Sequence, residues 1–74
     1  MTIHEKIKAL REEQTDYNQT ELGEILNMSQ MQISRIETGR AHLQDEDLIA
    51  YCLHFGVSAD YILGLPKNLK YPER

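Results

Sequence analysis

One window of the sequence, Met28–His42, concentrates side chains that can form directional hydrogen bonds. Ile33 and Ile36 repeat there at helical spacing, so a helix that buries them turns its other side chains outward. The outward-facing residues are then Gln30, Met31, Ser34, Arg35 and Thr38. This set offers an amide, a guanidinium, two hydroxyls and one apolar side chain on a single surface.

Four of these residues have the chemistry to recognise base edges in a DNA major groove. Arg35 can donate to O6 and N7 of guanine together, although a solvated surface charge is the alternative for it. Gln30 can pair with adenine through its amide. Met31 can lie against a thymine methyl group, and the alternative for it is core filling, the usual role of methionine. The predicted base contacts are Gln30, Met31, Ser34 and Arg35.

A second set of residues suits the phosphate backbone. Asn18 and Gln19 begin the preceding helical run, where free backbone amides and the positive end of the helix dipole favour an anion. Simple helix capping is the alternative for Asn18. Arg40 is the charged candidate. The predicted phosphate contacts are Asn18, Gln19, Ser29, Thr38 and Arg40.

The overall charge argues against a protein that binds nucleic acid by net charge alone. The 74 residues carry a formal charge of -4, and the pI is near 5.2. The balance differs locally, because only Glu37 of the 12 acidic residues lies within Met28–His42. The basic or titratable residues of the same window are Arg35, Arg40 and His42. The window can therefore attract phosphates within an acidic protein.

Other kinds of chemistry find little support in the sequence. The three histidines lack metal-ligand spacing with one another or with Cys52, so we expect no metal and no other cofactor. Cys52 lies on an apolar stripe and is interpreted as a small core residue. No Gly-rich phosphate loop, catalytic triad or carboxylate constellation is present, and we expect no enzymatic activity.

The composition also indicates where the protein acts. A single cysteine cannot form an internal disulfide, and the opening MTIHEKIKAL is charged where a signal peptide would be apolar. No apolar run approaches the roughly 18 residues that span a bilayer. We therefore expect a reduced, cytoplasmic protein without a membrane role.

Helical signals dominate the rest of the chain, and alternating strand patterns are almost absent. Apolar residues recur at intervals of three and four, as in Leu22, Ile25 and Leu26. Glycine stops and helix-start signals bound five expected helices, at 2–14, 18–26, 29–38, 45–55 and 58–64. The start signals are the capping-box pairs Thr2 with Glu5, Asn18 with Glu21 and Ser29 with Gln32, the acids Asp45, Glu46 and Asp47, and the N-cap candidate Ser58. We predict an all-α domain over residues 1–64 and an extended tail over residues 65–74, where Pro66 and Pro72 oppose a helix.

The short break at Leu26–Ser29 separates two of these helices by about four residues. So tight a turn brings two backbones together, which requires a small residue on the first helix, and Gly23 is suited to that position. The turn also needs a residue that accepts left-handed backbone angles, as Asn27 does most readily among non-glycine residues. The second helix of the pair is then pushed outward.

Counted from Gln19, the pair has a small residue at the fifth place, a turn residue at the ninth and a β-branched residue, Ile33, at the fifteenth. This pattern resembles the helix-turn-helix of phage repressors and Cro, the Xre-like family. Four segments are each similar to that family in its order and spacing: LREE at 10–13, NQTELGEIL at 18–26, SQMQISRIETGR at 29–40 and FGVSADYILG at 55–64. The resemblance covers nearly the whole predicted domain.

The resemblance implies a compact five-helix, lambda-repressor-like DNA-binding domain whose second and third helices form the helix-turn-helix. It implies that the second helix crosses the phosphate backbone and that the third lies in the major groove. It further implies a structural ion pair between Arg11 and Glu37. Finally, it implies that Gln19 braces Gln30 and touches a phosphate.

The function that we expect is a sequence-specific transcriptional regulator, a repressor that binds double-stranded DNA. One helix-turn-helix touches only a few base pairs, so we expect a homodimer on an inverted repeat. Dimerisation is expected through the last helix and the tail, by way of Tyr61, Leu65 and Leu69. A disordered basic arm is the alternative interpretation of the tail.

A second hypothesis gives the same fold a protein partner. The chain would then be an antitoxin that neutralises a toxin, or another interaction module. The negative net charge favours this alternative, as does the scarcity of basic residues in Ala41–Leu43 after the third helix. The two functions can coexist in one protein, and a small enzyme is the least supported hypothesis.

Overall fold

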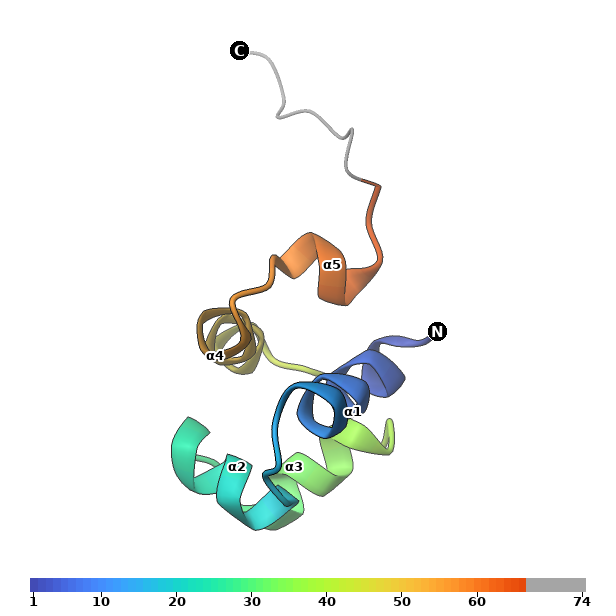
Figure 1. Cartoon of the computed structure of the whole chain (residues 1–74). Coiled ribbons are helices and arrows are strands. Elements are labelled where there is room, and N and C mark those ends of the chain that lie inside the picture. Colours follow the sequence, from blue (N-terminus) through green and yellow to red (C-terminus); the bar gives the residue numbers. More distant parts are fainter. Residues whose placement is uncertain (67–74) are drawn as a thin grey trace.

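The computed structural model describes residues 1–66, and these residues form five α-helices and no strand (Figure 1). The helices are α1 (Ile3–Gln14), α2 (Gln19–Leu26), α3 (Gln30–Glu37), α4 (Asp45–Phe55) and α5 (Ala59–Leu63). The predicted all-α, five-helix fold is therefore confirmed, and each predicted range agrees with the observed helix once its capping residues are counted. Most of the predicted tail, including Leu69, lies outside the described residues.

Short polar side chains begin four of the five helices. The N-cap residues of α1, α2, α3 and α5 are the predicted Thr2, Asn18, Ser29 and Ser58. Reciprocal capping boxes form at α1 and α2, where Glu5 and Glu21 return a carboxylate to the N-cap amide. At α3 the Ser29 hydroxyl accepts from the Gln32 amide at 3.1 Å, but within residues 1–66 no return bond forms. The box predicted there is only half present.

The helix α4 starts differently, because its N-cap residue Gln44 makes no side-chain capping bond within the described part of the chain. Its first turn instead carries the three acids Asp45, Glu46 and Asp47, as the sequence predicts. Negative side chains at this end interact favourably with the helix dipole.

One apolar core joins the five helices. Its buried members are Ile7, Leu10, Leu22, Ile33, Ile36, Tyr51 and Ile62. Two residues of the expected apolar stripes lie outside it, since Ile3 and Ile25 are 41% and 44% exposed. Ile25 is exposed because the inward face of α2 runs through Leu22, Gly23 and Leu26, which leaves Ile25 at its edge.

The helix α1 lies in the middle of the fold and contacts α3 on one side and α5 on another. The helices α2 and α3 contact each other at one end of the molecule, and α5 lies at the other end (Figure 1). The helix α4 packs between these groups, against α2 and α5. Among residues 1–66, this arrangement leaves the outer side of α3 free of other helices.

The turn between α2 and α3 depends on two residues. Asn27 has φ 60° and ψ 43°, and it is the single non-glycine residue with positive φ among residues 1–66. A side-chain Cβ at Gly23 would collide with the carbonyl oxygen of Met28, whose amide donates to the Gly23 carbonyl at 2.7 Å. Glycine at position 23 therefore permits the close approach of the turn to α2, as sequence reasoning required.

We find no helix within residues 1–66 that is long and apolar enough to cross a membrane.

Candidate nucleic-acid interface

The outward residues of α3, together with its C-cap residue Thr38, form one surface, which we call the α3 face. It consists of Gln30, Met31, Ser34, Arg35 and Thr38. Their spacing places them in adjacent rows along one side of the helix, opposite the buried Ile33 and Ile36. Four of the five side chains are exposed, and Ser34 is half-buried. The structure thus brings all four predicted base contacts onto one accessible surface.

Two members of the α3 face touch each other. The Arg35 guanidinium lies 3.3 Å from the Met31 sulfur, one helical turn away. Met31 is 58% exposed, so it does not fill the core, and that alternative interpretation is wrong. The methionine sulfur therefore lies beside the arginine on the exposed surface.

Behind the α3 face lies a buried ion pair. Glu37, at the end of α3, is 3% exposed, and its carboxylate accepts from Nε and Nη2 of Arg11 at 2.8 and 2.9 Å. The third guanidinium nitrogen of Arg11 donates to the Tyr17 carbonyl at 3.1 Å. The hydrogen bond to Glu37 raises the pKa of Arg11 above its ordinary value. One side chain of α1 therefore holds both α3 and the turn before α2, and the implied Arg11–Glu37 pair is present.

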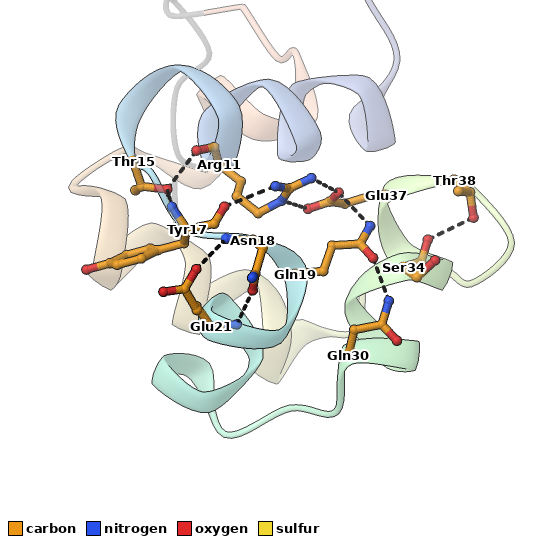
Figure 2. Close-up of polar contacts among 10 residues, drawn as sticks. All are labelled: Arg11, Thr15, Tyr17, Asn18, Gln19, Glu21, Gln30, Ser34, Glu37 and Thr38. Carbon is orange, nitrogen blue, oxygen red and sulfur yellow. Dashed lines mark hydrogen bonds and ion pairs between the residues drawn. The ribbon is translucent and has the colours of Figure 1, made fainter.

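A chain of hydrogen bonds connects this ion pair to the protein surface (Figure 2). The amide nitrogen of Gln19 donates to Glu37 Oε1 at 3.1 Å. The amide oxygen of Gln19 accepts from the amide nitrogen of Gln30 at 2.7 Å. The implied contact of Gln19 with Gln30 is thus present, and it orients the first residue of the α3 face.

Burial of Glu37 changes the charge that this side of the molecule presents. The single acid of the window Met28–His42 is both buried and paired with Arg11. Arg35 and Arg40 are exposed. The surface of the window is therefore basic, although the whole chain is acidic.

The predicted phosphate contacts lie on or beside the α3 face, and four of the five make hydrogen bonds within the protein. The side-chain Oδ1 of Asn18 accepts from the Glu21 backbone amide at 2.8 Å, and the Ser29 hydroxyl accepts from the Gln32 backbone amide, so both side chains cap helices. The Thr38 hydroxyl donates to the Ser34 carbonyl at 2.8 Å. Arg40 is exposed in the turn after α3. Their roles at phosphates stay predictions.

One contact of this surface was not foreseen from the sequence, namely the bond from Gln19 to Glu37. The resemblance pairs Glu37 with Arg11 and Gln19 with Gln30, but no sequence pattern joins the two pairs. The residues are separated by 18 positions, and only the packing of α2 against α3 brings them together.

No group of three or more histidine, cysteine or acidic side chains with metal-binding geometry occurs within the described residues.

Comparison with known proteins agrees with this architecture. A helix-turn-helix family model matches residues 7–62, from within α1 to within α5. Among solved structures, the chain is similar to the P22 c2 repressor protein crystallised with the synthetic operator 9T, with 28% sequence identity and a TM-score of 0.77. The similarity covers 85% of this chain and 94% of that one. No curated protein matches the sequence. The chain therefore belongs to the helix-turn-helix family of DNA-binding transcriptional regulators, in the Xre-like group of phage repressors that its motifs resemble.

Proposed function

We propose that this protein is a sequence-specific repressor of transcription that binds an inverted-repeat operator in the cytoplasm as a homodimer. One observation carries the proposal: the α3 face exposes directional hydrogen-bonding groups, while Glu37, the acid that would repel phosphates there, is buried against Arg11. The P22 c2 repressor, similar over most of the chain, was crystallised with an operator. The helix α3 would lie in the major groove, as in other helix-turn-helix proteins.

Within this proposal the α3 face contacts bases. The Arg35 guanidinium would donate to guanine O6 and N7, and the Gln30 amide would pair with adenine. Met31 would pack against a thymine methyl group, and the Ser34 hydroxyl would reach a base edge between these contacts. Each good bidentate pair contributes about 1–3 kcal/mol of discrimination between bases.

The phosphate contacts would fix the position of α3 along the groove. Asn18 and Gln19 lie at the N-terminal end of α2, where the helix dipole favours an anion. Ser29 and Thr38 flank α3, and Arg40 adds a full positive charge beyond it. Such contacts orient the protein on the duplex without reading its sequence.

A dimer would double the number of base pairs contacted. Half-sites about one helical turn apart, or multiples of that, suit two copies related by a two-fold axis. Tyr61 and Leu65 are 55% and 45% exposed at the end of the described chain, which supports a role for α5 and the following residues in assembly. Leu69, the third predicted contact, lies outside the described residues.

Selection from a random duplex library tests this proposal directly. The full chain should enrich a palindrome whose half-sites are spaced by about 10–10.5 base pairs or a multiple of that. Sedimentation on the enriched duplex should give two chains per site. Enrichment of no sequence would refute specific binding, and enrichment of an asymmetric site by one chain would refute the dimer.

A protein partner is the second candidate function, and a different surface favours it. The helix α4 exposes Ile49 and Leu53, at 56% and 80%, beside the acidic Glu46. We call these three residues, which share one side of the helix, the α4 face. An antitoxin could use such a face to hold a toxin while α3 contacts DNA. Binding of a toxin encoded beside this gene, lost on Leu53→Gln, would support that function.

A further inference from the structure

We propose that Glu37 is a positioning residue for base recognition: acting through Gln19, its carboxylate fixes the amide of Gln30 so that adenine is preferred over guanine at the base pair that Gln30 contacts. This inference rests on the proposed function. It assigns to the buried ion pair a part in specificity beyond its structural role.

The Glu37 carboxylate determines which way the Gln19 amide faces. An ionised carboxylate offers acceptors alone, so every polar group facing it must donate. Two Arg11 nitrogens occupy its two oxygens, at 2.8 and 2.9 Å. Gln19 approaches Oε1 at 3.1 Å and must therefore present its amide nitrogen. The orientation of the Gln19 amide follows from this chemistry, independently of how its nitrogen and oxygen are assigned.

Gln19 in turn determines which way the Gln30 amide faces. Because the nitrogen of Gln19 points at Glu37, its oxygen points outward and requires a donor. Gln30 supplies that donor from its amide nitrogen at 2.7 Å. The amide of Gln30 is thereby held in one of its two orientations by a group on another helix (Figure 2).

Gln30 keeps one hydrogen-bond donor and one acceptor for a base. Its amide nitrogen carries two hydrogens, of which Gln19 takes one. One N–H and the carbonyl oxygen remain free, which is the pattern that matches N7 and the N6 amino group of adenine. With the opposite orientation, the oxygen would face Gln19 and both hydrogens would point outward. Those two donors would match O6 and N7 of guanine.

Burial explains why this device can work. Glu37 is buried and its bond to Gln19 is partly buried, so an unsatisfied polar group there costs more than at the surface. An exposed glutamine alone would turn its amide over freely. The helix α3 therefore carries, at its buried end, the acceptor that orients the exposed residue at its other end.

The test uses the full chain and the operator half-site that it selects. Gln30→Ala first identifies the base pair at which preference is lost. Dissociation constants are then measured for duplexes with adenine or guanine at that position, for the wild type and for Glu37→Gln. In Glu37→Gln one acceptor oxygen becomes an amide nitrogen, so Gln19 competes with Arg11 for the remaining oxygen and its own amide can reverse. A bidentate pair gives roughly 5- to 150-fold discrimination, so we expect the adenine-to-guanine ratio to fall by at least about fivefold.

Arg11→Lys is the matched control, because it weakens the same ion pair and leaves the Glu37 carboxylate unchanged. Its melting temperature should fall while the adenine-to-guanine ratio stays at the wild-type value. An equal loss of affinity for both duplexes in Glu37→Gln would overturn the inference, and so would an equal change of ratio in Arg11→Lys.

Gln19→Met keeps the inference testable if Glu37→Gln does not fold. It removes the link to Gln30 but leaves the Arg11–Glu37 pair intact, and a lost phosphate contact lowers affinity for both duplexes alike. The ratio should again fall by at least about fivefold, and an unchanged ratio would overturn the inference. If the wild type prefers no base at any position, the proposed function itself fails, whereas a preference that survives both variants refutes the positioning role alone.

Discussion

The helices α3 and α4 each bury one polar side chain, and the two side chains differ in whether their polar atoms are hydrogen-bonded. Glu37 on α3 is 3% exposed, and its carboxylate accepts three hydrogen bonds. Tyr51 on α4 is fully buried, and its hydroxyl has no hydrogen-bond partner among residues 1–66. Buried polar groups stabilise a fold when they are satisfied and cost free energy when they are not.

The outer sides of α3 and α4 also differ, in the polarity of their exposed side chains. The α3 face carries an amide, hydroxyls and Arg35, and Gln30 is connected to the buried carboxylate through Gln19. The α4 face combines Glu46 with the aliphatic Ile49 and Leu53. Oriented polar groups suit recognition of base edges, whereas the α4 face offers mainly apolar contact and a single carboxylate, which would repel phosphates. The comparison predicts that changes near α3 alter DNA recognition and that changes on α4 do not.

The largest expected effect comes from removing the partner of Glu37. Arg11→Ala leaves a buried carboxylate without its counter-charge, and breaking such a pair costs about 3–5 kcal/mol. For a domain of this size, that loss is a large part of the total free energy of unfolding. Urea unfolding followed by circular dichroism measures it.

A double substitution distinguishes a lost charge partner from lost packing. Arg11→Met with Glu37→Met replaces both members by apolar side chains, which is often neutral for a buried pair. We expect the double variant to be more stable than Arg11→Ala, yet to lose the adenine preference at the Gln30 position. A double variant as unstable as Arg11→Ala would show that the cost does not arise from the unpaired charge.

The second effect concerns two arginines on the α3 side, since α4 carries no lysine or arginine. Arg35→Ala should reduce discrimination at one base position by about 1–3 kcal/mol. Arg40→Ala should weaken binding to every sequence alike and reduce the slope of log affinity against log salt by about one unit. Fluorescence anisotropy over a salt series measures both quantities. Equal losses on all sequences from both variants would remove Arg35 from the base contacts.

The third effect tests the unsatisfied hydroxyl of α4. Tyr51→Phe removes a buried polar group without a partner, so it should raise the free energy of unfolding by about 1 kcal/mol at neutral pH. Tyr61→Phe, at a side chain that is 55% exposed, is the control and should change it by less than about 0.5 kcal/mol. A clear destabilisation by Tyr51→Phe would mean that the hydroxyl is hydrogen-bonded.

The same hydroxyl predicts a difference at alkaline pH. Burial, and then the nearby negative charge of Glu37, raises the pKa of Tyr51 above its ordinary value of 10.0. Above pH 10 the unfolded chain loses this proton while the folded chain keeps it, so wild-type stability falls as pH rises, by up to about 1.4 kcal/mol per pH unit. Tyr51→Phe should not show this fall, and denaturant unfolding between pH 9 and 11 compares the two.

Local chemistry explains why so much of the fold was predictable. Thr2 and Asn18 cap helices that the sequence marks by their capping-box spacing to Glu5 and Glu21, and Ser58 is a short polar residue directly before a helical run. Gly23 and Asn27 identify the tight turn because few other residues tolerate its geometry. These signals each depend on a few neighbouring residues.

Features that depend on distant packing were not predictable. The bond between Gln19 and Glu37 forms across two helices, and the missing partner of Tyr51 follows from the packing around α4. The edge position of Ile25 depends on which side of α2 meets the core. The α3 face could be identified from helical spacing because Ile33 and Ile36 fix the inward side, but the group that orients Gln30 could not.

The smallest expected effect on stability provides the most direct comparison of the two faces. Met31 on α3 and Leu53 on α4 are both exposed apolar side chains, at 58% and 80%, so replacing either with glutamine should change the free energy of unfolding by less than about 0.5 kcal/mol. Met31→Gln removes the sulfur beside Arg35 and places a second amide on the α3 face, so the base preference of the selected site should change. Leu53→Gln should leave both the selected site and its affinity unchanged, because within residues 1–66 no side-chain hydrogen bond or ion pair joins α4 to the α3 face. A changed site with Leu53→Gln would show that the two faces are coupled, and an unchanged site with Met31→Gln would leave the methionine as a mere support for the arginine.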